Sequence, residues 1–99
     1  MRFVIDPGHP ALPGHFPGQP VVPGVVVLDR VLEAIERDAG PLAALRLPQV
    51  KFVQPLLPAE AAEIALEPLA SDAGRRWRFR VLRGDMLIAS GEIAAGSAP

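Results

Sequence analysis

The sequence predicts an α+β domain in which one long helix packs against a curved antiparallel sheet. Two observations lead to this prediction: one helical stretch over residues 24–38, and later stretches with strand character. The strand-like stretches follow one another through short turns, which favours antiparallel pairing. Because 99 residues accommodate one domain, we expect residues 1–99 to fold as a single unit.

The chain opens with a short strand, predicted over Arg2–Ile5, and continues into a proline-rich loop. Ten of the eighteen residues from Pro7 to Gly24 are proline or glycine, a density that excludes helix and regular ladder pairing. The loop also contains four apolar residues, which are Leu12, Phe16, Val21 and Val22. A solvated linker would not carry them, so we expect an ordered, functional loop.

A helix is predicted from Gly24 to Asp38. Pro23 is tolerated at the first helical turn, and Gly40 with Pro41 provides the stop signal. At 100° per residue, one arc is polar and contains Asp29, Arg30, Glu33, Glu36 and Arg37. The opposite arc contains Leu28, Val31, Leu32 and Ile35. The first turn is apolar all round, so we expect the helix to enter the fold buried.

The rest of the chain is strand-like. Residues 46–56 and 63–67 form the first two of these predicted strands. Residues 76–81 alternate strictly, with Trp77 and Phe79 on the face that we expect to be core. Residues 83–85 then make a turn before a last strand over residues 86–94.

Composition argues against several function classes. The net charge is −1, with 10 basic and 11 acidic side chains, which does not favour nucleic-acid binding. The sequence shows neither a membrane-spanning run nor a signal peptide, so we expect a cytoplasmic protein without membrane contact. With no cysteine and two histidines, we expect no disulfide and no metal site. A chain of this length can bury only a thin core, and this favours a dimer.

Residues 14–29 carry the strongest signal: Gly-His-Phe-Pro-Gly-Gln-Pro-Val-Val-Pro-Gly-Val-Val-Val-Leu-Asp. This stretch resembles the FabA/FabZ family of 3-hydroxyacyl-[acyl-carrier-protein] dehydratases, in which a His-Phe-x-Gly-x-Pro-x-x-Pro-Gly loop leads into a helix with an acidic residue. The matching positions are His15, Phe16, Gly18, Pro20, Pro23 and Gly24, and Asp29 follows the histidine by fourteen residues. The resemblance implies the hotdog fold, a long helix wrapped by an antiparallel sheet, with each active site at a dimer interface.

The resemblance also implies acid–base removal of water from a 3-hydroxyacyl thioester. The neutral imidazole of His15 would take the C2 proton, and Asp29 would protonate the leaving hydroxyl. Apolar neighbours such as Val25, Val26 and Leu32 would favour the neutral, proton-donating form of Asp29 by desolvation.

Backbone groups complete the implied site. The Gly24 N–H, at the positive end of the helix, would stabilise the thioester oxygen, and the Val21 carbonyl would orient His15. Further substrate-binding positions are Phe16, Pro23, Val25 and Glu33. We expect no cofactor, because the acyl group would arrive on the 4′-phosphopantetheine of an acyl carrier protein or on coenzyme A.

Two departures from the family pattern keep alternatives open. Glu33 stands one turn after Asp29, where many members carry glutamine, and the helix that usually precedes the first strand is missing. The first hypothesis is a dehydratase of fatty-acid or polyene-type lipid synthesis, as a homodimer, heterodimer or higher oligomer. The second is a catalytically weak hotdog partner subunit of a heterodimeric dehydratase, and the third is a hotdog acyl-thioesterase. Acyl length, isomerase activity and the choice between carrier protein and coenzyme A stay open.

Four arginines are predicted to form a basic stripe on one strand face: Arg76, Arg78, Arg80 and Arg83. Acyl carrier proteins are generally acidic, so this stripe could steer and dock one. The alternative is a solvated outer face that discourages edge-to-edge aggregation.

Overall fold

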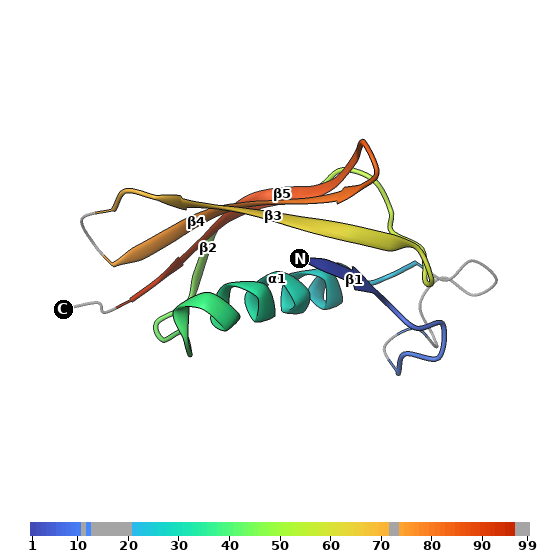
Figure 1. Ribbon diagram of the computed structural model, residues 1–99, viewed down its shortest axis with the longest axis horizontal. Coiled ribbons are helices and arrows are strands. Elements are labelled where there is room, and N and C mark those ends of the chain that lie inside the picture. The colour runs from blue at the N-terminus through green and yellow to red at the C-terminus, as the bar shows by residue number, and fades with distance from the viewer. Residues whose placement is uncertain (11, 13–20, 72–73, 97–99) are drawn as a thin grey trace.

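The computed structural model describes residues 1–10, 12, 21–71 and 74–96. The elements in this part of the chain are β1 (Arg2–Val4), α1 (Gly24–Ala39), β2 (Arg46–Phe52), β3 (Ala61–Leu69), β4 (Arg75–Arg83) and β5 (Met86–Ala95). All strand pairs are antiparallel, in the sheet order β1-β3-β4-β5-β2. Figure 1 shows the long, curved sheet lying over α1. The predicted α+β arrangement is confirmed.

Helix α1 begins at Gly24, as predicted, and ends one residue later than expected, at Ala39. Gly40 closes it with a φ of 80°, and its N–H donates to the Glu36 carbonyl at 2.9 Å. The helix buries Val26, Val27, Val31, Ala34 and Ile35. The expectation of a first turn buried all round is wrong, because Val25 is 68% exposed.

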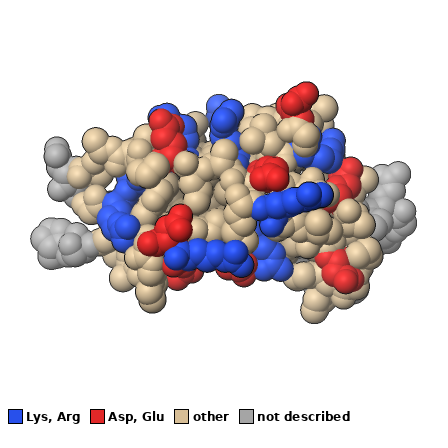
Figure 2. Space-filling view, in the orientation of Figure 1, with Lys and Arg blue, Asp and Glu red and all other residues tan. Residues whose placement is uncertain are grey.

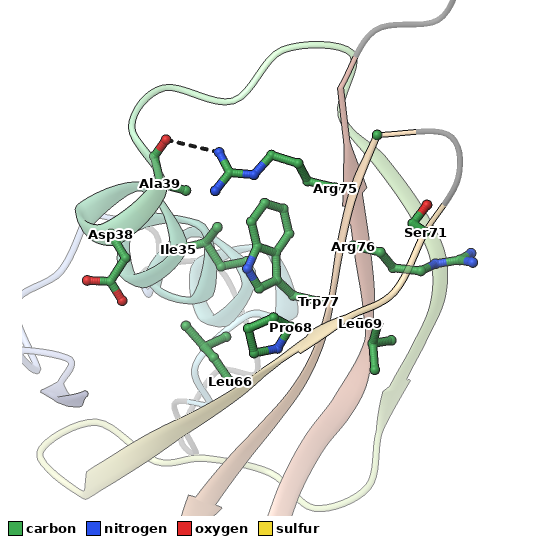
Figure 3. A pocket seen from close by; sticks show the side chains of 11 residues that line it. Ile35, Asp38, Ala39, Leu66, Pro68, Leu69, Ser71, Arg75, Arg76 and Trp77 are labelled. Carbon is green, nitrogen blue, oxygen red and sulfur yellow. Dashed lines mark hydrogen bonds between the residues drawn. The ribbon is translucent and has the colours of Figure 1, made fainter.

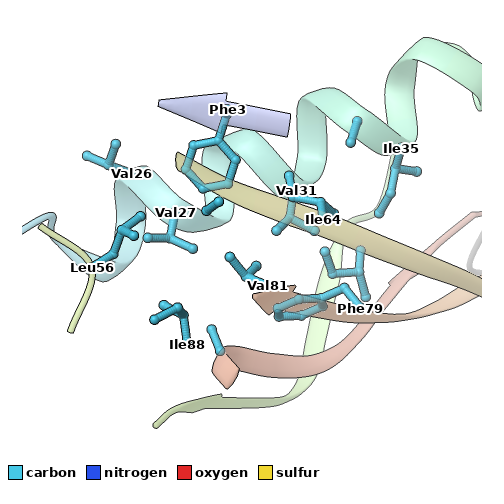
Figure 4. Packing of buried hydrophobic residues seen from close by; sticks show 14 of the residues in the cluster. Phe3, Val26, Val27, Val31, Ile35, Leu56, Ile64, Phe79, Val81 and Ile88 are labelled. Carbon is cyan, nitrogen blue, oxygen red and sulfur yellow. The ribbon is translucent and has the colours of Figure 1, made fainter. Parts of the chain in front are cut away.

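The core lies between α1 and the inner face of the sheet, where apolar side chains from both layers meet (Figure 4). Trp77, Phe79 and Val81 of β4 are buried there, as their alternation predicts. Val31 meets them from the helix. Each buried side chain of this kind contributes about 1.5–3 kcal/mol. This packing fixes the rotation of α1, and therefore which of its residues face outward.

Among the described strands, β2 forms one edge of the sheet and pairs only with β5. Leu47 and Phe52 of this strand are 45% and 53% exposed. Gly91 of β5 stands opposite Val50, and a Cβ at Gly91 would overlap the carbonyl oxygen of Gln49. The glycine therefore permits the close approach that keeps the edge strand in the sheet.

Candidate active site

The amino terminus of α1 presents backbone donors. Pro23 occupies the N-cap position, and no side chain of the described residues caps the helix. Val26 and Val27 donate to the Pro23 carbonyl at 3.0 and 3.3 Å, whereas the amides of Gly24 and Val25 have no acceptor among the described residues. The positive end of the helix dipole coincides with these two amides. An oxygen that carries negative charge would be stabilised here.

An aromatic ring lies against this helix end. A Cβ on Gly24 would stand 2.5 Å from Cζ of Phe52, so glycine is the residue that admits the ring as placed. Val25 follows Gly24 in the chain, and its side chain and that of Phe52 are 68% and 53% exposed. We call these two side chains the N-terminal patch. Adjoining exposed apolar groups mark surfaces that a ligand or a second protein covers.

Asp29 lies on the exposed side of α1, five residues after Gly24. Glu33 follows one turn later, and its carboxylate accepts two hydrogen bonds from Arg30, at 2.8 and 3.1 Å. Sequence reasoning missed this role of Arg30, although a spacing of three residues is that of a helical ion pair. The expected desolvation of Asp29 by Val25 is not met within one chain, because both side chains are exposed.

The loop that would complete the site is described only in part. His15 and Phe16 lie outside the described residues, so the expected contact between His15 and the Val21 carbonyl stays a prediction. Val21 is half-buried at the described end of the loop. The next residue, Val22, is buried, and its N–H donates to the Leu56 carbonyl at 2.8 Å. This bond fixes the entry of the loop into α1.

The predicted basic stripe divides into paired and unpaired arginines. On the outer face of the sheet, Arg78 pairs with Glu67 at 3.2 Å. Arg76 Nε lies 3.0 Å from the Glu92 carboxylate, close enough for an ion pair but not aligned as a hydrogen bond. Arg80 forms no ion pair within the described chain. Basic and acidic side chains are interspersed in the view of Figure 2.

Arg83 does not belong to this stripe, which corrects the prediction. Period-two alternation along β4 places it with Val81, on the inner side of the strand. Its guanidinium donates to the Pro55 carbonyl at 3.1 Å and to the Glu60 carboxylate at 3.0 Å. Arg83 therefore ties down the connection between β2 and β3.

A hollow of about 440 Å³ lies at the other end of α1, against the ends of β3 and β4 (Figure 3). There the Arg75 guanidinium lies 5.1 Å from the centre of the Trp77 ring and donates to the Ala39 carbonyl at 3.1 Å. None of the described residues that were predicted as catalytic or substrate-binding lines this hollow. It is about 20 Å along the helix from Gly24.

Within residues 1–10, 12, 21–71 and 74–96, no three His, Cys, Asp or Glu side chains converge as metal ligands would. Over the same residues, no helix combines the length and apolar character needed to cross a bilayer.

Sequence comparison relates the chain to dehydratases. Residues 1–92 match the ApeI-like family, described as ApeI dehydratase. The 3-hydroxyacyl-[acyl-carrier-protein] dehydratase FabZ of Thermus thermophilus is 37% identical over 86 residues, covering 87% of this chain and 49% of that enzyme. The chain spans 49–63% of the length of the curated FabZ relatives that it matches. The resemblance to the FabA/FabZ type is confirmed.

Structure comparison agrees. The dehydratase heterocomplex ApeI:P from Xenorhabdus doucetiae is similar with a TM-score of 0.76 and 25% identity, covering 97% of this chain and 84% of that one. The fluoroacetyl-CoA thioesterase FlK gives a TM-score of 0.65 at 17% identity, covering 97% and 82%, a likeness of fold alone. The expected hotdog fold is confirmed.

Proposed function

The chain belongs to the ApeI-like dehydratase family, and on that basis we propose that it dehydrates 3-hydroxyacyl thioesters, carried on acyl carrier protein, to trans-2-enoyl thioesters. One observation carries the proposal: α1 holds both a backbone donor and an acidic side chain. The Gly24 amide at its start has no acceptor among the described residues, and the carboxyl of Asp29 lies on its exposed side. His15 precedes them within the family motif. The setting would be fatty-acid or polyene-type lipid synthesis.

In the proposed reaction, His15 takes the proton from C2, and the electron pair of that C–H bond forms the C2=C3 double bond. The C3–O bond breaks, and Asp29 gives its proton to the departing hydroxyl, which leaves as water. Negative charge develops on the thioester oxygen, where the Gly24 N–H and the positive helix end stabilise it. Transfer of the proton from His15 to Asp29 then restores both groups. Base, acid and backbone donor supply this chemistry without a cofactor.

A second subunit is part of the proposal. In one chain Asp29 is exposed, whereas an acid that keeps its proton near neutral pH needs less polar surroundings. The N-terminal patch and the uncovered edge of β2 offer a surface for a second hotdog subunit. Each site would then combine the imidazole of one subunit with the carboxyl of the other.

The direct test mixes the purified protein with a 3-hydroxyacyl-carrier-protein thioester and follows the loss of water by mass spectrometry. We expect His15→Ala and Asp29→Asn each to lower turnover by about 10²- to 10⁴-fold. Thermal melting should change little for Asp29→Asn, because that side chain is exposed. Undiminished turnover in both variants would refute the mechanism. Release of free acid in place of the enoyl product would identify a thioesterase.

A second candidate function is that of a partner subunit. The likeness to the ApeI:P heterocomplex favours it, as does Glu33, held by Arg30 where many family members carry glutamine. In this case the chain would complete a related dehydratase subunit and keep a weak site of its own. Absence of turnover alone, with turnover on adding that subunit, would distinguish this function from the first.

A further inference from the structure

The outer face of the sheet, on the side away from α1, carries charge in rows that cross the strands. The antiparallel registers place Ala65, Arg80, Ser90 and Lys51 in one row. The neighbouring row contains Glu67, Arg78, Glu92 and Gln49. Residues directly opposite in such a sheet have Cβ atoms about 5 Å apart. Arg80 and Lys51 therefore flank Ser90 from either side, and we call these three residues the cationic row.

The carboxylates nearest to the cationic row are engaged by other arginines. Glu92 contacts Arg76, and Glu67 contacts Arg78, at 3.0 and 3.2 Å. Glu63, the other described carboxylate on this face, stands opposite Arg2, on the β1 side. Lys51 and Arg80 are exposed and form no ion pair within the described chain.

The surface beside the cationic row is hollowed. A depression of about 280 Å³ has polar lining residues from three strands, which are Gln49, Arg78, Arg80, Ser90 and Glu92. Gln49 and Ser90 supply neutral donors beside the guanidinium of Arg80. An acidic side chain that enters this depression would meet a cation and hydrogen-bond donors together, which is the arrangement that charge-assisted hydrogen bonds require.

We propose that the cationic row is the docking surface for the acidic face of the acyl carrier protein, an inference that rests on the proposed function. Arg76, Arg78 and Arg83 would have to leave carboxylates of their own chain before they could bind a partner. Arg80 and Lys51 lose no such contact, so an anion brought to them gives a net gain. Of the four arginines in the predicted stripe, only Arg80 belongs to the cationic row. Lys51, which sequence reasoning missed, is its second cation.

The position of Lys51 connects the row to the candidate active site. Lys51 immediately precedes Phe52, whose ring lies against Gly24 at the start of α1. Successive residues of a strand project to opposite faces, so the row and the N-terminal patch lie on the two sides of the same end of β2. A carrier docked on the row would therefore sit across one strand from the proposed chemistry.

Binding to the carrier protein without an acyl group tests the docking directly. We expect Lys51→Glu and Arg80→Glu each to raise the dissociation constant about tenfold at low salt, with smaller effects as salt increases. Arg37→Glu is the matched control: it makes the same charge change at an exposed position on α1, and should alter binding less than twofold. Unchanged binding in both row variants would overturn the proposal. An equal loss in Arg37→Glu would also overturn it, by showing an effect of net charge alone.

Turnover separates docking from chemistry. With carrier-bound substrate, the row variants should show a KM raised by the same factor and an unchanged kcat, whereas all variants should act equally on a pantetheine thioester that has no carrier. Equal impairment on both substrates would contradict a docking role. Weaker carrier binding in a protein that turns over neither substrate would leave the docking surface supported and refute the proposed function.

Discussion

The two ends of α1 differ in what satisfies their backbone groups. At the carboxyl end, Gly40 caps the helix, and Arg75 reaches from β4 to the Ala39 carbonyl. At the amino end, the amides of Gly24 and Val25 have no acceptor among the described residues, and the side chains around them are exposed. An end closed by the chain's own groups serves the fold, whereas an open end is available to a substrate or a second subunit.

The largest difference in stability is expected between two substitutions in α1: one at a buried residue near its carboxyl end, and one at an exposed residue at its amino end. Ile35→Ala is expected to lower the free energy of unfolding by about 2–5 kcal/mol, because it leaves a cavity in the core. Val25→Ala should cost less than about 0.5 kcal/mol, since its side chain is exposed. Urea denaturation at several protein concentrations measures both. Equal losses at low concentration would break the comparison, while a loss at Val25 confined to high concentration would show that a second subunit covers it.

Gly24→Ala should impair turnover more than folding. The added Cβ would meet the Phe52 ring, and the amide that we propose to hold the thioester oxygen would shift, which can cost about 100-fold in rate. Stability should change by less than about 1 kcal/mol, because alanine favours helix and the Phe52 side chain is 53% exposed, not packed in the core. Adding Phe52→Ala should restore part of the rate. Full activity in Gly24→Ala would remove this amide from the mechanism.

At the carboxyl end of α1, a substitution should lower stability more than turnover. Arg75→Gln removes the stacking on Trp77 and the bond to the Ala39 carbonyl, and is expected to destabilise the fold by about 1 kcal/mol. Turnover should stay at the wild-type level, as measured beside thermal melting. A loss of activity without a loss of stability would mean that this end also takes part in function.

The smallest effect is expected at Glu33. Glu33→Gln weakens an exposed ion pair with Arg30, so stability should fall by no more than about 0.5 kcal/mol. We expect turnover within about threefold of wild type, since glutamine is common at this position in the family that the sequence resembles. A tenfold change in kcat would instead place the Glu33 carboxylate in the reaction.

Local signals predicted most of the fold. The start and stop residues of α1 and the alternation in β4 act over a few positions, and both elements lie where expected. The pairing of β2 with β5 could not be predicted, because alternation shows which face of a strand is buried but not which strand lies beside it. Arg83 was assigned to the wrong face of β4. Side chains alternate between the two faces of a strand, so only the even-numbered positions from Arg76 onward share the face of the stripe.

Only the part of the candidate site that comes from a single chain could be predicted from the sequence. The motif predicts Gly24 and Asp29 as site residues, which stays a prediction, and periodicity places Asp29 in the polar arc, which the structure confirms. In the proposed dimer, shielding of its carboxyl would require atoms from a second subunit, which no local pattern in this chain encodes. Arg76 contacts Glu92 and Arg78 contacts Glu67, which leaves Lys51 and Arg80 without an ion pair in the described chain. This pairing depends on strand register and could be known only from the structure.

The proposed assembly with a second subunit would depend on the absence of a single methyl group at Gly91. Any larger residue would collide with the Gln49 carbonyl and press β2, the strand at the open rim of the sheet, away from its neighbour. Because α1, β3, β4 and β5 supply most of the packed interior and no buried residue of the core belongs to β2, we expect such a substitution to leave a folded chain in which β2 is displaced. In a genetic screen, an allele at this glycine would therefore behave like the deletion of a binding partner.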